Sequence, residues 1–296
     1  MTDTRHPSAL TRHVAGFGLL EGARWYPPHG LVFSDMTNGG VYTLDHDEAR
    51  PIIEHRRGVG GLVAHADGGF VVSGRNVALR TIGASPTTTV LLETQPDEQF
   101  FNDLTADARG RLFVGSVAKN DGGLGTEGTV DRRPGRLYQL DLDGAVRVLA
   151  DDVKVSNGLG TDPDGDRLYH VDSNRRTIWS FDLDADDPAV TRTSFADTSE
   201  YSGVPDGLCV AVDGSVWAAI AGGSVVVVWD AQGRRTHELP VPQPLVTSVC
   251  LGGPQLATLF VLTGATDEEP DPLGGAVYST DVDVRGLPAP YARVRR

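Results

Sequence analysis

Short apolar runs recur along the chain and are separated by polar, glycine-rich turns. Clear pairs of runs are 31–35 with 40–45, 167–172 with 177–182, and 215–219 with 223–230. Each pair has the pattern of two strands joined by a turn, and the second strand often ends in Asp. Helical periodicity is hard to find over any window of about 12 residues. The pattern therefore predicts an all-β chain.

Weaker copies of the same unit complete a repeat. They lie at 69–73, at 111–115 with 136–141, and at 258–262 with 275–279. Six copies at spacings of roughly 40 to 55 residues are typical of the blades of a propeller. We expect one domain over residues 1–296, a six-bladed β-propeller with four antiparallel strands per blade, in which the first strand completes the last blade. Residues 1–13 are expected to be a flexible N-terminal segment, and 118–134 a long loop on one face of the disc.

Composition agrees with many tight turns and excludes several function classes. The chain has 36 Gly and 18 Pro, and its formal net charge is −14. Its arginines occur in isolated pairs beside turns, so no basic face for nucleic acid is expected. Residues 1–10 are polar and no apolar run reaches about 18 residues, so we expect neither a signal peptide nor a membrane span, and a cytoplasmic location.

The two cysteines give no framework. Cys209 and Cys250 both lie inside apolar runs, which predicts two buried thiols rather than a disulfide or a metal site. The eight histidines are scattered without metal-type spacing. No Gly-x-Ser-x-Gly elbow or phosphate-binding loop is present.

Polar residues at four places lie beside the repeated strands and break their apolar pattern. They are Glu21, the pair Asn102–Asp103, Asn157 and Asp206, each just ahead of an expected strand. Because the inner strands of a closed ring converge on its axis, these side chains would meet there. Two carboxylates and amide oxygens at one point would need a cation to offset their repulsion. We expect one divalent metal cation: Ca²⁺, Mg²⁺ and Mn²⁺ prefer oxygen ligands, and Zn²⁺ and Fe²⁺ are compatible.

Each of these positions also has a structural interpretation. Asn157-Gly158 and Asp206-Gly207 are common hairpin turns, and Asn102-Asp103 fits an Asx turn. Asp35 and Asp172 end apolar strands, and we expect them to hold blade turns rather than a metal. Spacing alone leaves the metal site and the turns as alternatives.

A resemblance to a known family changes that balance. The segments that carry it, in this order and spacing, are 21–25, 33–35, 101–103, 107–116, 156–159, 169–173, 204–209 and 274–278. From about Glu21 to Pro290 the chain resembles the family of senescence-marker proteins, regucalcin, gluconolactonases and related sugar lactonases. That family binds one divalent metal through a Glu, an Asn and an Asp, which match Glu21, Asn157 and Asp206.

The resemblance also implies a reaction. A metal-dependent lactonase, a carboxylic ester hydrolase, would polarise the lactone carbonyl with its metal, and a water would attack the carbonyl carbon. The match to Asp206 is proposed there as general base. Asn102 would contact substrate or a metal-bound water and stabilise the oxyanion. The expected partner is a small-molecule lactone or ester bound near Phe100, Asn102 and Asp103, and the expected assembly is a monomer or a small homo-oligomer.

Two departures from the family pattern concern the substrate. Sugar-lactone members often carry Arg two residues before the substrate Asn, where this chain has Phe100. Their Glu-Gly-Pro is Glu21-Gly22-Ala23 here. An aromatic ring suits a polyhydroxylated sugar less well, so a less polar lactone or ester is one hypothesis. The alternative is that Phe100 only packs under the neighbouring loop.

Three other functions stay open. The same metal platform could hydrolyse another ester or a phosphotriester, because both reactions need a Lewis acid and a water. A non-enzymatic calcium-binding propeller is a second alternative. A condensing propeller like strictosidine synthase should need a Glu base and no metal, so the complete Glu/Asn/Asp set argues against it.

Overall fold

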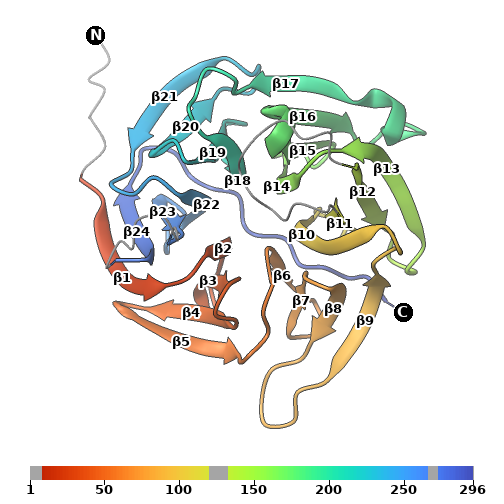
Figure 1. Ribbon diagram of the computed structural model, residues 1–296, viewed down its shortest axis with the longest axis horizontal. Coiled ribbons are helices and arrows are strands. Elements are labelled where there is room, and N and C mark those ends of the chain that lie inside the picture. The colour runs from red at the N-terminus through yellow and green to blue at the C-terminus, as the bar shows by residue number, and fades with distance from the viewer. Residues whose placement is uncertain (1–8, 120–132, 266–272, 296) are drawn as a thin grey trace.

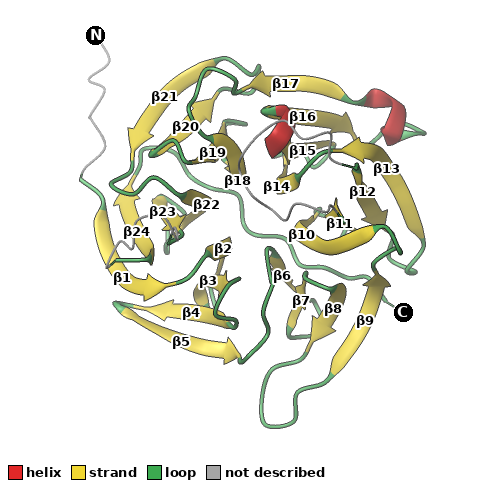
Figure 2. Cartoon of the chain, in the orientation of Figure 1, coloured by secondary structure: helices red, strands yellow, loops and turns green. Residues whose placement is uncertain are grey.

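Six antiparallel sheets of four strands each surround a central axis (Figure 1). The structure is a computed structural model that describes residues 9–119, 133–265 and 273–295. Within these ranges the helical elements are two 3₁₀ turns, η1 (Ser173–Arg175) and η2 (Pro188–Thr191) (Figure 2). Among the described helices, none has the length and apolar character needed to cross a membrane. The expected all-β, six-bladed β-propeller is confirmed.

In blades 1, 2 and 3 the chain runs outward from the axis, strand by strand. Blade by blade, these strands are β2 (Leu20–Tyr26), β3 (Gly30–Asp35), β4 (Val41–Asp45) and β5 (Glu48–Ile53); β6 (Leu62–Ala64), β7 (Phe70–Val72), β8 (Asn76–Arg80) and β9 (Thr88–Glu93); and β10 (Glu98–Ala106), β11 (Leu112–Ala118), β12 (Gly135–Leu140) and β13 (Val146–Val153). The predicted apolar runs are mostly the second and third strands of a blade.

Blades 4, 5 and 6 repeat this order, except that the outer strand of blade 6 comes from the N-terminus. Their strands are β14 (Ser156–Thr161), β15 (Arg167–Asp172), β16 (Thr177–Asp182) and β17 (Thr193–Asp197); β18 (Val204–Val210), β19 (Val216–Ala221), β20 (Val225–Trp229) and β21 (Arg235–Pro240); and β22 (Val246–Gly252), β23 (Thr258–Thr263), β24 (Gly275–Asp281) and β1 (Thr11–Phe17).

The ring closes by pairing its first strand with its last. β1 runs antiparallel to β24, with Thr11 opposite Ser279 and Val14 opposite Val277. The expected closure is therefore confirmed. The expected flexible segment 1–13 is wrong over its last three residues, because 11–13 belong to β1, where Thr11 and Arg12 pair with β24. Residues 1–8, and 120–132 of the expected loop 118–134, lie outside the described residues.

The inner strands carry the irregularities that matter for the axis. Pairing with the second strand shifts register between Glu21 and Arg24 in β2, and between Phe101 and Leu104 in β10. The same shift occurs in β14 after Ser156 and in β18 after Pro205. A bulge of this kind leaves residues unpaired and re-aims their side chains. The bulges contain Asn102, Asp103, Asn157 and Asp206, and the bulge in β2 begins directly after Glu21.

Adjacent inner strands approach so closely that glycine is required beside the bulges. A β-carbon at Gly61 of the loop before β6 would lie 2.4 Å from Asp103 Oδ1, and one at Gly158 would lie 2.5 Å from the backbone oxygen of Asp206. Any side chain there would push neighbouring blades apart. The apolar core lies between the blades: one cluster joins blades 1, 2 and 3 through residues such as Tyr26, Phe70 and Leu104.

The C-terminal strap, residues 285–295, crosses one face of the disc. Figure 1 shows this segment in blue, running from blades 5 and 6 across the middle to the C-terminus. Gly286 N donates to Leu256 O, Ala292 N to Ala64 O, and Arg293 N to Gly110 O. Ala292 and Val294 of the strap are buried. The strap therefore ties distant blades together and adds to the closure made by β1.

Removing the strap should destabilise the ring. Truncation after Val284 deletes at least five inter-blade backbone hydrogen bonds and uncovers apolar surface, so we expect the free energy of unfolding to fall by about 5 kcal/mol. The midpoint of thermal unfolding should then drop by about 10 °C, measured by circular dichroism. Val190→Ala, at an 80% exposed residue, serves as the control and should change nothing. An unchanged midpoint in the truncated chain would contradict a closing role.

Candidate metal centre

The residues singled out from the sequence come together at the axis from four different blades. Glu21 lies on β2, Asn102 and Asp103 on β10, Asn157 on β14, and Asp206 on β18. All are inside inner strands at bulges, so the expectation that they precede strands, and the turn interpretations, are wrong. The reason is that an inner strand needs no continuous apolar pattern where it lines a polar axis.

A chain of hydrogen bonds connects three of the four blades. Asn102 Nδ2 donates to Asn157 Oδ1 at 3.1 Å and to the backbone oxygen of Ser156 at 2.9 Å. Asn157 Nδ2 donates to Ser173 Oγ at 3.2 Å, and Ser173 Oγ donates to Pro205 O at 2.7 Å. The amide of Asn157 is thereby held with its oxygen toward β10. Ser173, which was not among the predicted site residues, joins the strands of Asn157 and Asp206.

Two of the three candidate metal ligands, Glu21 and Asp206, are buried carboxylates that repel each other. Glu21 is 6% exposed and Asp206 is 7% exposed. Loss of water raises the pKa of Glu21 well above its usual range, and the charges of Asp206 and Asp103 raise it further. Burial, followed by the charge of Asp103, likewise raises the pKa of Asp206. The site therefore favours an added proton or a cation.

One oxygen of this cluster has no partner. Asp206 Oδ1 is buried, and no group in the described part of the chain hydrogen-bonds to it. A buried carboxylate oxygen without a partner is costly unless something positive reaches it. The orphaned oxygen, the second carboxylate of Glu21 and the amide oxygen of Asn157 form an all-oxygen donor set of the kind that hard divalent cations take. The residues present thus fit a divalent metal.

Asp103 differs from the other two carboxylates because it is held by the protein itself. Its Oδ1 accepts from Leu104 N at 2.7 Å, and its Oδ2 accepts from Leu159 N at 3.3 Å. The guanidinium of Arg24 lies 3.6 Å from Oδ1. Burial raises the pKa of Asp103, and Arg24 with the two N–H groups opposes that rise. Each oxygen accepts one hydrogen bond from the backbone, which gives Asp103 a structural and electrostatic role; its predicted contact with substrate stays a prediction.

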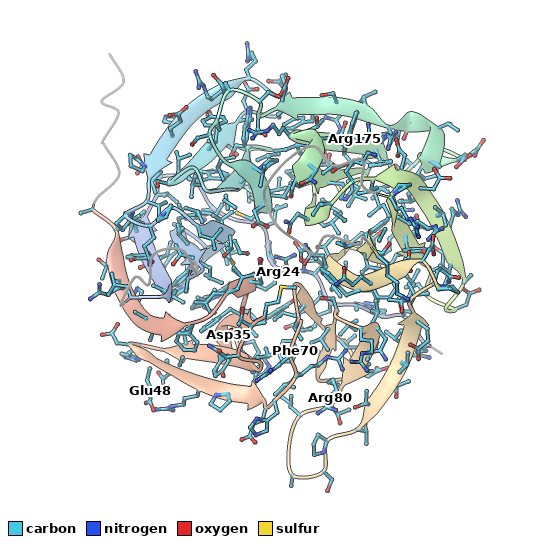
Figure 3. All side chains as sticks on the ribbon, viewed as in Figure 1. Arg24, Asp35, Glu48, Phe70, Arg80 and Arg175 are labelled. Carbon is cyan, nitrogen blue, oxygen red and sulfur yellow. The ribbon has the colours of Figure 1, made fainter. Side chains whose placement is uncertain are left out.

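Arg24 occupies the centre of the disc (Figure 3). Its NH1 donates to Ala23 O at 2.9 Å and its NH2 to Leu104 O at 3.0 Å, so it braces β2 against β10.

A cavity of about 490 Å³ is lined in part by Arg24, Trp25, Cys209, Cys250 and the C-terminal strap. The two cysteines are free thiols, as expected, but only Cys250 is fully buried. Burial raises its pKa to about 12.

Phe100 lies on the inner strand β10, close to the axial residues in sequence. It is half-buried on β10 opposite Val117, two residues before Asn102. The neighbouring Phe101, in contrast, is fully buried in the core. The predicted contact of Phe100 with substrate stays a prediction.

The strand-ending aspartates hold turns, as expected. Asp35 accepts from the backbone N–H of Gly18, Thr37 and Asn38. Asp172 accepts in the same way from Lys154 and Val155. Each carboxylate therefore fixes the segment that enters the inner strand of its own blade, three residues before Glu21 in one case and two before Asn157 in the other.

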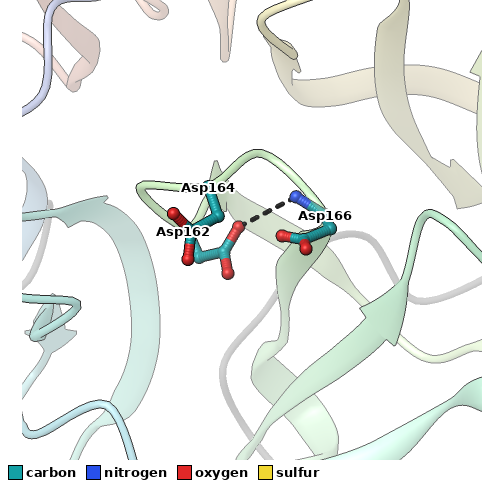
Figure 4. A group of neighbouring side chains, drawn as sticks. All are labelled: Asp162, Asp164 and Asp166. Atoms are coloured by element: carbon teal, nitrogen blue, oxygen red, sulfur yellow. Dashed lines mark hydrogen bonds between the residues drawn. The ribbon is translucent and has the colours of Figure 1, made fainter.

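A second acidic group lies away from these residues. Asp162, Asp164 and Asp166 share a turn after β14 (Figure 4). Asp162 Oδ1 accepts from the backbone N–H of Gly165, Asp166 and Arg167. The other two side chains are exposed. The turn accounts for this arrangement without a metal.

Comparison with known proteins covers both the fold and the axial residues. The SMP-30/gluconolactonase/LRE-like region matches residues 19–265, from β2 to β23. A pentonolactonase of Haloferax volcanii is 30% identical over 94% of this chain and 95% of its own. A luciferin-regenerating enzyme superposes with a TM-score of 0.83 at 25% identity, over 98% of this chain and all of that one. A calcium-binding regucalcin of Agrobacterium tumefaciens superposes with a TM-score of 0.80 at 21% identity, over 96% and 98% of the two chains.

The match from residue 19 to residue 265 includes Glu21, Asn102, Asp103, Asn157 and Asp206, and the propeller agrees over nearly the whole length. This chain therefore belongs to the SMP-30/gluconolactonase/LRE-like family.

Proposed function

We propose that the protein is a metal-dependent hydrolase that opens a lactone ring to a hydroxy acid. The observation that carries the proposal is the orphaned, buried Oδ1 of Asp206 beside the carboxylate of Glu21. Membership of the family and 30% identity to a pentonolactonase support the reaction type. Lactone opening needs an electrophilic group and a base close together, and this site offers both.

Glu21, Asn157 and Asp206 would hold one divalent cation, and Ca²⁺, Mg²⁺, Mn²⁺, Zn²⁺ and Fe²⁺ are the candidates. Bound there, the cation would supply Lewis-acid polarisation of the lactone carbonyl. Three protein ligands leave room for substrate and water. Ser173 would fix the orientation of the Asn157 amide, because its hydroxyl accepts from Asn157 Nδ2 and leaves the amide oxygen as the ligand atom.

Asp206 is the proposed general base. It takes a proton from a water, and the oxygen of that water bonds to the carbonyl carbon. The bond between that carbon and the ring oxygen then breaks, and the ring oxygen receives the proton. No covalent intermediate with the protein forms.

The structure suggests a different role for Asn102 from the expected one. Both N–H bonds of its amide are directed to protein acceptors, Asn157 Oδ1 and Ser156 O. We therefore assign Asn102 to positioning Asn157, in place of direct stabilisation of the oxyanion.

Replacing either buried carboxylate ligand should abolish turnover while the fold survives. Glu21→Ala and Asp206→Ala each remove a ligand, and Asp206→Ala also removes the base, so kcat/KM should fall by about 10³-fold or more. A panel of lactones with each metal restored, together with elemental analysis, measures this. Asp164→Ala, in the exposed acidic turn, should keep full activity.

Full lactonase activity of the metal-free wild-type protein would contradict the proposal. Including an organophosphate in the same panel distinguishes a lactonase from a phosphotriesterase. Bound metal without hydrolysis of any ester would indicate a calcium-binding propeller instead.

Without metal, the buried carboxylates should make stability fall as pH rises. An unfolded Asp titrates near pH 4, whereas the folded pKa of Asp206 is higher, so the folded state binds more protons in between. Asp206→Asn removes this loss and should stabilise the metal-free protein by about 1 kcal/mol at pH 8. The gain should vanish at pH 4. Thermal unfolding of chelator-treated protein measures both values, and a gain independent of pH would contradict the explanation.

The aromatic ring at position 100 should disfavour sugar lactones. We expect the wild-type protein to prefer aliphatic or aromatic lactones over aldonolactones. Phe100→Arg adds donors for substrate hydroxyls and should shift the ratio of kcat/KM values toward aldonolactones by about tenfold. Phe100→Leu, which stays apolar, should leave the preference unchanged. A clear preference of the wild type for aldonolactones would show that Phe100 only packs.

A further inference from the structure

Four charged side chains are buried together at the axis, and only two of them form a pair of opposite charges. Glu21, Asp103 and Asp206 are carboxylates, and Arg24 is a guanidinium. Arg24 lies 3.6 Å from Asp103, with side-chain exposures of 10% and 5%. The charges of Asp103 and Asp206 both act on Glu21. With all four groups ionised, their sum is two negative charges.

We propose that Arg24 sets the charge of the metal centre: by neutralising Asp103, it leaves a net charge of −2 that matches a divalent cation. This inference rests on the proposed function only in placing the cation between Glu21 and Asp206. In this proposal Arg24 acts through its charge and is not a ligand of the cation.

The contacts of Arg24 show why this charge is permanent and fixed. A guanidinium stays protonated at any pH at which the protein is folded. Two of its nitrogens are held by the backbone oxygens of Ala23 on β2 and Leu104 on β10. At 3.6 Å from Asp103 Oδ1 it makes no direct hydrogen bond, so its effect on Asp103 is mainly electrostatic.

Two consequences follow for cation binding. If Asp103 loses its charge while Arg24 keeps its own, the centre has a net charge of −1 and an uncompensated cation beside it, which repels the metal. If Arg24 loses its charge while Asp103 stays ionised, the centre has a net charge of −3 and favours a trivalent ion. Removing both charges restores −2. A purely structural role for Arg24 would not predict that removing Arg24 restores the cation affinity lost in Asp103→Asn.

The test measures binding of calcium chloride and terbium chloride to the full-length protein by titration calorimetry. Asp103→Asn should weaken Ca²⁺ binding on the order of tenfold or more. Adding Arg24→Met to that variant should return the Ca²⁺ dissociation constant to within about threefold of the wild-type value. Arg24→Met alone, assayed at pH 8, should shift the ratio of Tb³⁺ to Ca²⁺ affinity toward Tb³⁺ by about tenfold.

The chain offers a matched control pair. Arg111 and Asp107 are 2.6 Å apart with side-chain exposures of 12% and 1%, a burial close to that of Arg24 and Asp103. Asp107 lies four residues past Asp103 along the chain, about 13 Å in extended backbone, and its charge is compensated by Arg111. Asp107→Asn changes the net charge by the same amount as Asp103→Asn, and Arg111→Met by the same amount as Arg24→Met. Both control variants should leave the cation affinity unchanged.

The outcomes separate the inference from the proposed function. Wild-type affinity in Asp103→Asn, or a double variant as weak as Asp103→Asn, overturns the role of Arg24 while the metal centre stands. A wild-type protein that binds neither ion defeats the metal centre and this inference with it. Circular dichroism checks the fold of each variant. If Arg24→Met alone does not fold, Asp103→Asn and the double variant carry the test.

Discussion

The burial of like charges at the axis is the constraint on which the rest of this structure depends. Ring closure brings Glu21 and Asp206 into a region where water cannot separate them, and one oxygen of Asp206 has no partner among the described residues. A stable core would replace such groups with apolar ones. Their burial and their raised pKa values make sense if a cation completes the site, as the proposed chemistry requires.

Bulges and glycines convert a repetitive scaffold into this particular site. A regular inner strand would alternate its side chains between the two faces of its own blade. The register shifts after Glu21, Phe101, Ser156 and Pro205 interrupt that alternation at one level of the ring. Glycine next to the bulge lets neighbouring blades approach closely, as Gly158 does against Asp206. The same local device, repeated in four blades, therefore directs side chains that are far apart in sequence to one point.

Residues around the axis divide into the proposed metal ligands and the residues that hold those ligands in place. Ser173 orients Asn157 and joins it to the strand of Asp206, while Asp35 and Asp172 fix the segments that enter β2 and β14. Arg24 and Asp103 form a separate pair of opposite charges that compensate each other. Of the three buried carboxylates, Asp103 is thus compensated by protein groups, and Glu21 and Asp206 are the two left for the proposed metal.

The sequence by itself determined the propeller, because a repeat of short strands and turns is a local property that each blade shows separately. It also contained the axial residues, since Glu21, Asn157 and Asp206 interrupt the apolar pattern and match the family. Only the tertiary structure decided that these residues lie in bulged strands, that 11–13 belong to the last blade, and that Asp103 is paired with Arg24. Ser173 and Arg24 lie in segments that match the family, but their roles cannot be predicted along the chain, because what they do depends on which strands ring closure places beside them.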